Sequence, residues 1–127
     1  MSRVLIADDE PHIRRLVCFT LGNKGFEVLE ATDGGEAYDR AREELPDIVL
    51  LDVMMPIMTG YEVLEKLKAD PLTRDIPVVM LSAKSQQTEV QAGLAGGACE
   101  YICKPFTPKD LVQRVAEILG AQGEGPA

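Results

Sequence analysis

Short apolar runs rich in β-branched residues alternate with helical segments along this chain, and no other feature limits the possible folds as strongly. Five runs have the length and composition of buried strands: residues 4–7, 28–31, 48–51, 78–81 and, more weakly, 101–103. Strands that are apolar throughout and alternate with helices are typical of a parallel sheet with both faces covered. Because such crossovers are right-handed, we expect an α/β fold, a (βα)5 doubly wound sheet of five parallel strands with helices on both faces.

The segments between these strands carry apolar side chains at helical spacing. Three such stripes comprise Ile13, Leu16, Val17 and Leu21; Tyr61, Leu64 and Leu67, with Val63 beside them; and Leu111, Val115 and Ile118, flanked by Val112 and Leu119. Thr107 is the expected N-cap of the last helix, with Pro108 at its first position. Glycines in and just after the segment 87–96 predict that it forms the least stable helix.

Length and composition predict one domain. A chain of 127 residues fits a single folded unit, which we place at residues 1–120. The small polar segment 121–127 is expected to be a flexible tail or the start of a linker. Hydrophobic residues make up 46% of the chain and aromatic residues only 5%, so one mainly aliphatic core is expected.

Charge and cysteine content argue against several functions. A net charge of −8 should repel nucleic acids and anionic membranes, so we expect no direct binding to either. Cys18, Cys99 and Cys103 are odd in number and lack CxxC spacing, which favours reduced thiols over a disulfide framework and predicts a cytoplasmic protein. Since the chain has one histidine, buried thiols explain Cys99 and Cys103 better than a metal site does. The sequence shows neither a signal peptide nor a membrane span.

Chemically reactive side chains follow four of the expected strands. They are Asp8 and Asp9 after the first strand, Asp52 after the third, Ser82 after the fourth and Lys104 after the fifth. Because parallel strands end at one edge of a sheet, where ligands bind in such folds, these groups should converge there. Each of them alone is more often a helix cap, a turn residue or a solvated charge. Their joint occurrence at four strand ends favours a functional site.

The chemistry of this set points to transfer of a phosphoryl group onto a carboxylate. Crowded carboxylates repel one another unless a cation lies among them, and oxygen ligands with water suit Mg²⁺. A lysine and a hydroxyl group would bind oxygens of the transferred group while Asp52 attacks the phosphorus in line. Asp52 is therefore the predicted phosphoacceptor, with Ser82 and Lys104 assisting and Mg²⁺ as the cofactor.

These motifs resemble the receiver domain of two-component response regulators. The segment 47–64, DIVLLDVMMPIMTGYEVL, is similar to the family's phosphoacceptor region, an apolar strand that ends in Asp and is followed by MPxMxG. The other motifs of the family are matched, in order and at the usual intervals, by Asp8-Asp9, Ser82-Ala83 and Lys104-Pro105-Phe106. The resemblance covers about residues 3–119 and implies a flavodoxin-like fold. It also implies a phosphoprotein that is phosphorylated by a histidine kinase or phosphotransfer protein and controls a downstream protein partner or a C-terminal output domain.

The resemblance assigns roles to the metal site. Asp9, Asp52 and the backbone carbonyl of Met54 would bind Mg²⁺ directly, and Asp8 would act mainly through metal-bound water. Thr59 would cap the helix that follows the phosphoacceptor loop.

The resemblance also implies a switch. Ser82 and Lys104 would hold the phosphoryl oxygens, and Ser82 would move toward the phosphoryl group. The ring of Tyr101 would then turn inward into the vacated space, which makes a two-state element biased by a new charge.

Some positions depart from the family's commonest pattern. The side chain of Met54 cannot orient an attacking water through a hydrogen bond, so we expect slow self-dephosphorylation and no other enzymatic activity. Cys99 and Glu100 stand where many members have two aspartates. This difference argues against a dimer joined by charged pairs from residues such as Lys109 and Arg114.

Two other functions fit part of this pattern. A degenerate receiver would serve only as a protein-interaction module, but every phosphorylation residue is present. A haloacid-dehalogenase-type phosphatase needs its nucleophile in a DxD motif at the first strand, whereas Met54 stands two positions beyond Asp52. Neither a P-loop nor a dinucleotide-binding motif occurs. His12 opens the first helix and is expected to be exposed and inert.

Overall fold

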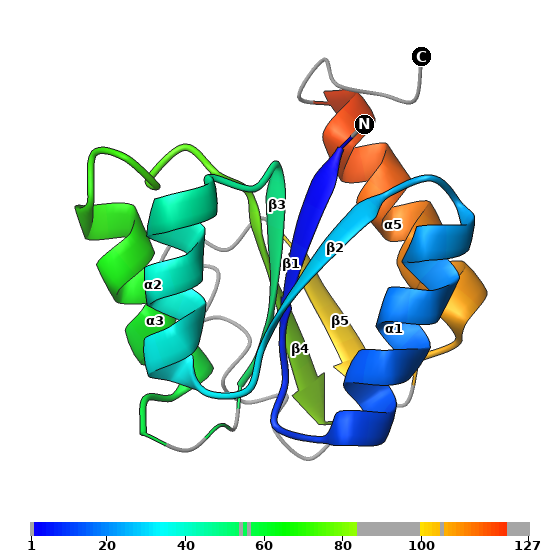
Figure 1. The fold of residues 1–127 in the computed structure, drawn as a ribbon, viewed down its shortest axis with the longest axis horizontal. Helices are drawn as coiled ribbons and strands as arrows, with labels where there is room; N and C mark the ends of the chain where they lie inside the picture. The colour runs from blue at the N-terminus through cyan, green and yellow to red at the C-terminus, as the bar shows by residue number, and fades with distance from the viewer. Residues whose placement is uncertain (1, 54, 56, 84–99, 105, 122–127) are drawn as a thin grey trace.

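The strands form one parallel sheet. The computed structural model describes residues 2–53, 55, 57–83, 100–104 and 106–121. The five strands of this part lie in the order β2-β1-β3-β4-β5, and every neighbouring pair is parallel (Figure 1). Their bounds are β1 Arg3–Ala7, β2 Glu27–Ala31, β3 Ile48–Asp52, β4 Val78–Ala83 and β5 Glu100–Lys104. The predicted sheet is confirmed, and each strand is one or two residues longer than its apolar run.

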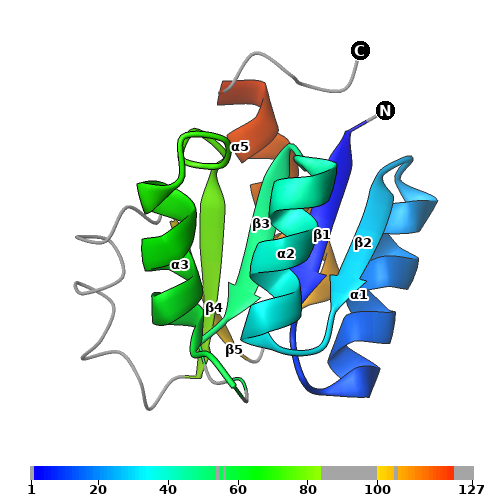
Figure 2. The same cartoon turned by 60° about the vertical axis from the view of Figure 1, so that its left-hand side comes forward.

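Helices cover both faces of this sheet. The helices of the described part are α1 Pro11–Asn23, α2 Gly34–Glu44, α3 Gly60–Ala69 and α5 Pro108–Ala121. Figures 1 and 2 show α1 and α5 on one face and α2 and α3 on the other. None of these helices is long and apolar enough to cross a bilayer. The expected helix in segment 87–96 and residues 122–127 of the expected tail lie outside the described residues.

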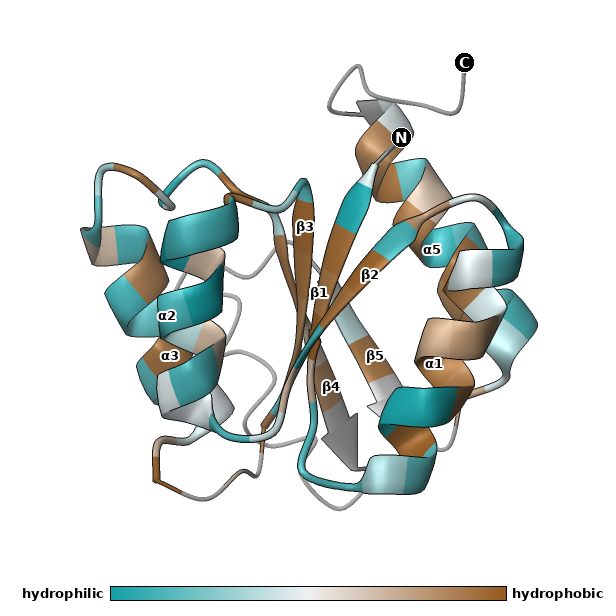
Figure 3. Cartoon of the chain, in the orientation of Figure 1, coloured by the Kyte–Doolittle hydropathy of each residue, from teal (hydrophilic) through white to brown (hydrophobic). Residues whose placement is uncertain are grey.

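The core consists of two aliphatic layers, one on each side of the sheet. Side chains alternate between the faces of a strand, so Ile6 and Leu50 face α1 and α5 while Leu5 and Leu51 face α2 and α3. All four are fully buried. Figure 3 shows the apolar strands enclosed by helices whose outer sides are hydrophilic. The predicted aliphatic core is confirmed.

Not every residue of the predicted apolar stripes is fully buried: Ile13, Tyr61, Val112 and Ile118 are half-buried, and Leu16 is exposed. Leu16 is 41% exposed, because α1 rests on the sheet through Val17 and Leu21 and consecutive helical residues point about 100° apart. In α5, Leu119 is buried and Ile118 only half-buried.

The predicted helix caps are present. The Thr59 side chain and the Glu62 side chain form a reciprocal capping box at the start of α3. The backbone N–H of Asp110 donates to the hydroxyl of Thr107 over 3.1 Å at the start of α5. These caps fix the two helices that begin beside the carboxyl edge of the sheet.

Asp70 connects α2 to the end of α3. Its Oδ2 accepts hydrogen bonds from Arg42 Nε over 2.6 Å and from the Tyr38 hydroxyl over 2.8 Å. Its Oδ1 accepts from the backbone N–H of Leu72 over 2.9 Å. These donors hold the pKa of Asp70 below its ordinary value, and the Leu72 N–H has the largest effect.

Candidate functional site

Asp8 and Asp52 meet at the carboxyl edge of the two central strands. Asp52 ends β3, and Asp8 follows β1 directly. Ala7 pairs with Leu51, so the two aspartates lie at the same level of neighbouring strands. Each stands two residues beyond a side chain that faces α1 and α5, which places both on that face. Both are buried, with exposed fractions of 0% and 5%. This is the switch point of the sheet, where ligands bind in doubly wound folds.

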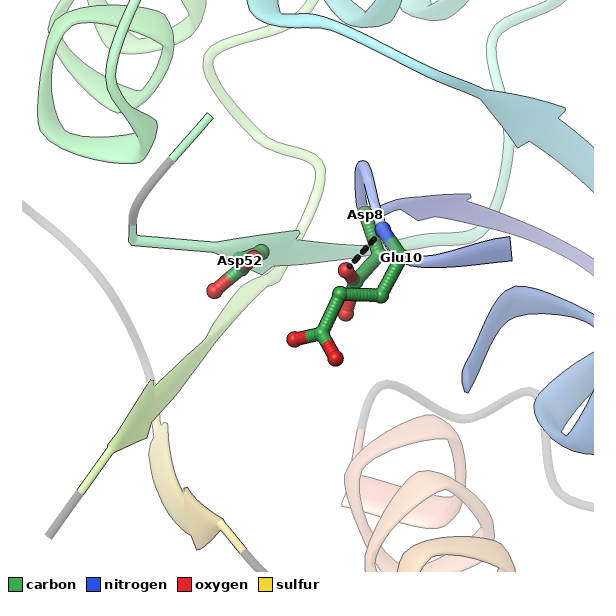
Figure 4. A group of neighbouring side chains, drawn as sticks. All are labelled: Asp8, Glu10 and Asp52. Atoms are coloured by element: carbon green, nitrogen blue, oxygen red, sulfur yellow. Dashed lines mark hydrogen bonds between the residues drawn. The ribbon is translucent and has the colours of Figure 1, made fainter. Parts of the chain in front are cut away.

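Glu10 adds a third carboxylate that the sequence analysis missed. One carboxylate oxygen from each of Asp8, Glu10 and Asp52 lies within 4.8 Å of the other two. Figure 4 shows the three groups facing a common space. Asp8 Oδ1 accepts a hydrogen bond from the backbone N–H of Glu10 over 2.9 Å, and this Asx turn fixes Glu10 relative to Asp8. The acidic run Asp8-Asp9-Glu10 was the available signal, because such a turn brings the first and third residues together.

Asp9, by contrast, is exposed and is not a member of this group of three carboxylates. His12 is exposed, as predicted, and its Nε2 lies 3.6 Å from Glu10 Oε2.

Backbone contacts hold Asp8 in place from two sides. Its N–H donates to the carbonyl of Ala31 in β2 over 3.2 Å. Its carbonyl accepts from Arg14 Nη1 over 2.7 Å, and Arg14 Nε lies 3.4 Å from Glu30 Oε1. The side chain of Arg14 is 15% exposed and that of Glu30 is 50% exposed, so this bridge from α1 to β2 is open to water at its β2 end. The turn that carries Asp8 and Glu10 is thereby fixed to the sheet.

The backbone that follows Asp52 is packed closely against the start of α3. The N–H of Val53 donates to the carbonyl of Leu81 over 3.0 Å, and the N–H of Gly60 donates to the carbonyl of Val53 over 2.9 Å. A Cβ atom on Gly60 would lie only 2.4 Å from the Asp52 carbonyl oxygen, so no other residue fits there without movement. Between these points Ile57 has a positive φ of 72°, which is strained for a β-branched residue.

The other predicted site residues are placed only in part. Asp52 pairs with Leu81, so Ser82 stands one residue beyond its level, and Lys104 pairs with Ala83. The backbones of Ser82 and Lys104 therefore lie at the predicted edge, while their side chains lie outside the described part, as does the whole of Met54. Tyr101 is half-buried in β5, and its hydroxyl shares a hydrogen bond with that of Tyr61.

Cys18 on α1 is a half-buried free cysteine. Burial, followed by the nearby carboxylate of Glu30, raises the pKa of its thiol to about 11. The thiol is therefore protonated and weakly nucleophilic at neutral pH, in keeping with a packing role on α1.

Comparison with known proteins agrees with this geometry. The family model described as the response regulator receiver domain matches residues 4–116. The chain is 44% identical over 117 residues to the phosphate regulon transcriptional regulatory protein PhoB of Escherichia coli, covering 92% of this chain and 51% of that protein. It is 41% identical over 126 residues to the DNA-binding response regulator MtrA of Mycolicibacterium smegmatis, covering 99% and 54%.

Solved structures of response regulators are also similar to this chain. The chemotaxis response regulator CheY4 of Vibrio cholerae superposes with a TM-score of 0.88 and 35% identity, over 94% of this chain and 99% of that one. This likeness confirms the flavodoxin-like fold. The chain spans about half the length of the curated relatives named above. It belongs to the response regulator receiver domain family of two-component systems.

Proposed function

We propose that this receiver accepts a phosphoryl group on Asp52 in a Mg²⁺-dependent reaction and thereby changes the surface that an output partner or domain contacts. The supporting observation is the convergence of Asp8, Glu10 and Asp52 at the switch point of the sheet, with carboxylate oxygens within 4.8 Å of one another. A histidine kinase or phosphotransfer protein is the proposed donor, in the cytoplasm. The phosphoryl group is proposed to remain long-lived, because the side chain of Met54 offers no hydrogen bond to an attacking water.

The donor set fits a small hard cation. Carboxylates at this separation repel one another, and two of the three, Asp8 and Asp52, are buried. Oxygen ligands select Mg²⁺ over softer metals. We propose that Asp8, Asp9, Asp52 and the backbone carbonyl of Met54 hold it, with the Glu10 carboxylate close by. When bound, Mg²⁺ supplies positive charge that offsets these carboxylates and attracts phosphoryl oxygens.

The proposed step is an in-line displacement at phosphorus. A carboxylate oxygen of Asp52 forms a bond to phosphorus while the bond from phosphorus to the donor's leaving group breaks, and that group departs with the electron pair. The product is an acyl phosphate. Ser82 donates its hydroxyl to one phosphoryl oxygen, and Lys104 neutralises another. Close packing of Gly60 against the Asp52 carbonyl oxygen restricts movement of the backbone that carries the nucleophile.

The names of the relatives suggest the kind of output. PhoB is named a transcriptional regulatory protein, and MtrA a DNA-binding response regulator. Because this chain matches about half of each, we propose that phosphorylation acts on a DNA-binding output region or a separate protein partner. With a net charge of −8, the receiver itself is not expected to contact DNA.

Beryllofluoride, a stable analogue of a phosphoryl group, tests the proposal. With Mg²⁺ present, it should shift the backbone amide resonances of Asp52, Val53 and Leu81 in the wild-type protein. The Asp52→Asn variant should show no such shift at the same concentrations. An unperturbed wild-type spectrum would support a degenerate receiver that serves only as an interaction module.

A further inference from the structure

Tyr61 and Tyr101 meet through their hydroxyl groups, although forty residues separate them in the chain. Tyr61 is the second residue of α3, and Tyr101 is the second residue of β5. Both rings are half-buried and pack against the core layer beneath α2 and α3. A half-buried tyrosine needs a partner for its hydroxyl, and each of these two rings provides one for the other.

Tyr61 is tied closely to the phosphoacceptor. Its neighbour Gly60 donates to the carbonyl of Val53 over 2.9 Å, and the space of its missing side chain is filled by the Asp52 carbonyl oxygen. The same space is bordered by the Cε of Met80, 3.0 Å from the position of a Cβ. Met80 pairs with Tyr101 across β4 and β5. The end of β3, the start of α3, Met80 of β4 and the start of β5 therefore form one continuous packed unit.

Tyr101 also faces the outer surface. It lines a hollow between β5 and α5, together with Ile102, Phe106, Asp110 and Arg114. The Tyr101 hydroxyl, meanwhile, is held at the start of α3.

We propose that the Tyr61 hydroxyl is the anchor that holds Tyr101 in its half-buried orientation and links that orientation to the backbone of Asp52. The part of the proposal that concerns signalling rests on the proposed function, in which Tyr101 is the switch. A hydrogen bond of ordinary net strength favours the anchored orientation over the released one by about fivefold. Tyr61 is thus a positioning residue for the switch.

The test uses Tyr61→Phe, which keeps the ring and removes the hydroxyl. Tyrosine ring protons are followed by NMR, and a soluble paramagnetic chelate measures their exposure to solvent. The relaxation enhancement at the Tyr101 ring should rise at least about twofold, because the released orientation gains population. Tyr101→Phe removes the other hydroxyl and should expose the ring at position 101 to a similar degree.

Tyr38→Phe is the matched control. Tyr38 is also half-buried, but its hydroxyl donates to Asp70 at the far end of α3. It should leave the Tyr101 ring unchanged. If Tyr61→Phe and Tyr38→Phe both leave the exposure of Tyr101 at the wild-type value, the anchor does not exist.

These measurements are made without Mg²⁺ or beryllofluoride, so they do not depend on phosphoryl chemistry. Wild-type protein that responds to beryllofluoride, together with an unchanged Tyr61→Phe ring, would overturn the anchor and leave the proposed function standing. If the Tyr101 ring becomes more exposed in Tyr61→Phe while beryllofluoride leaves the spectrum of the wild-type protein unchanged, the anchor is supported and the proposed function is overturned.

Discussion

Replacing Gly60 by alanine should both destabilise the domain and displace Asp52, the proposed phosphoacceptor. The added Cβ would lie 2.4 Å from the Asp52 carbonyl oxygen and 3.0 Å from Val53 Cα, and both of these are backbone atoms. Since ordinary contact begins at 3.4 Å, the start of α3 must move by about 1 Å. That movement would stretch or break the 2.9 Å hydrogen bond from Gly60 N–H to the Val53 carbonyl.

The expected cost follows from these two effects. Overpacking of a closely packed site costs about 1–3 kcal/mol, and the lost hydrogen bond costs about 1 kcal/mol. Alanine regains up to about 1 kcal/mol through its helix preference. The free energy of unfolding should therefore fall by about 2 kcal/mol.

Urea denaturation measures this change, and Gly22→Ala provides the control. Gly22 lies in α1, and a Cβ there would meet nothing within 4 Å, so alanine should be neutral or stabilising by about 0.5–1 kcal/mol. Gly60→Ala should also weaken beryllofluoride binding, because Asp52 is displaced. If the Gly60→Ala and Gly22→Ala variants had the same free energy of unfolding, the close packing of Gly60 on the Asp52 backbone would be refuted.

Three further predictions concern other parts of the molecule. Glu10→Gln should weaken Mg²⁺ binding roughly fivefold at low ionic strength, because it removes a negative charge whose oxygen lies within 4.8 Å of those of Asp8 and Asp52. Titration calorimetry beside Asp9→Asn will show which acidic neighbour contributes more, and an unchanged affinity would exclude Glu10 from the site. Hydrogen bonds to Asp70 lower the pKa of its carboxyl, and the largest effect comes from the backbone N–H of Leu72. Asp70 therefore stabilises the folded state at pH values above its unfolded pKa of about 4, and this stabilisation is lost as the pH falls through the folded pKa. Wild-type protein should therefore lose more unfolding free energy than Asp70→Asn on acidification below about pH 4, and parallel curves would contradict this. Ile57→Gly should raise the free energy of unfolding by about 1 kcal/mol, because glycine adopts the positive φ at this exposed position without strain; a loss of stability in urea would show that the loop depends on the Ile57 side chain.

The sequence predicted those features that depend on local periodicity and on strand ends. Apolar runs such as 48–51 revealed the parallel sheet, and the acids after them located Asp8 and Asp52 at one edge. Periodicity failed at Leu16 because a helical pattern does not reveal how a helix is rotated against the sheet.

Two features of the site required the three-dimensional structure. Glu10 joins Asp8 and Asp52 through the Asx turn formed by Asp8, and the acidic run Asp8-Asp9-Glu10 does not by itself show that this turn forms. The Tyr61–Tyr101 bond joins side chains from separate elements, whose contact depends on the packing of α3 on the sheet.

Phosphorylation of Asp52 is the central claim, and acetyl phosphate tests it most directly. Incubated with Mg²⁺, the wild-type protein should gain the mass of one phosphoryl group, and removal of Mg²⁺ by a chelator should prevent the gain. Asp52→Asn should gain nothing under the same conditions. An Asp52→Asn protein that still acquired the phosphoryl mass would contradict the account.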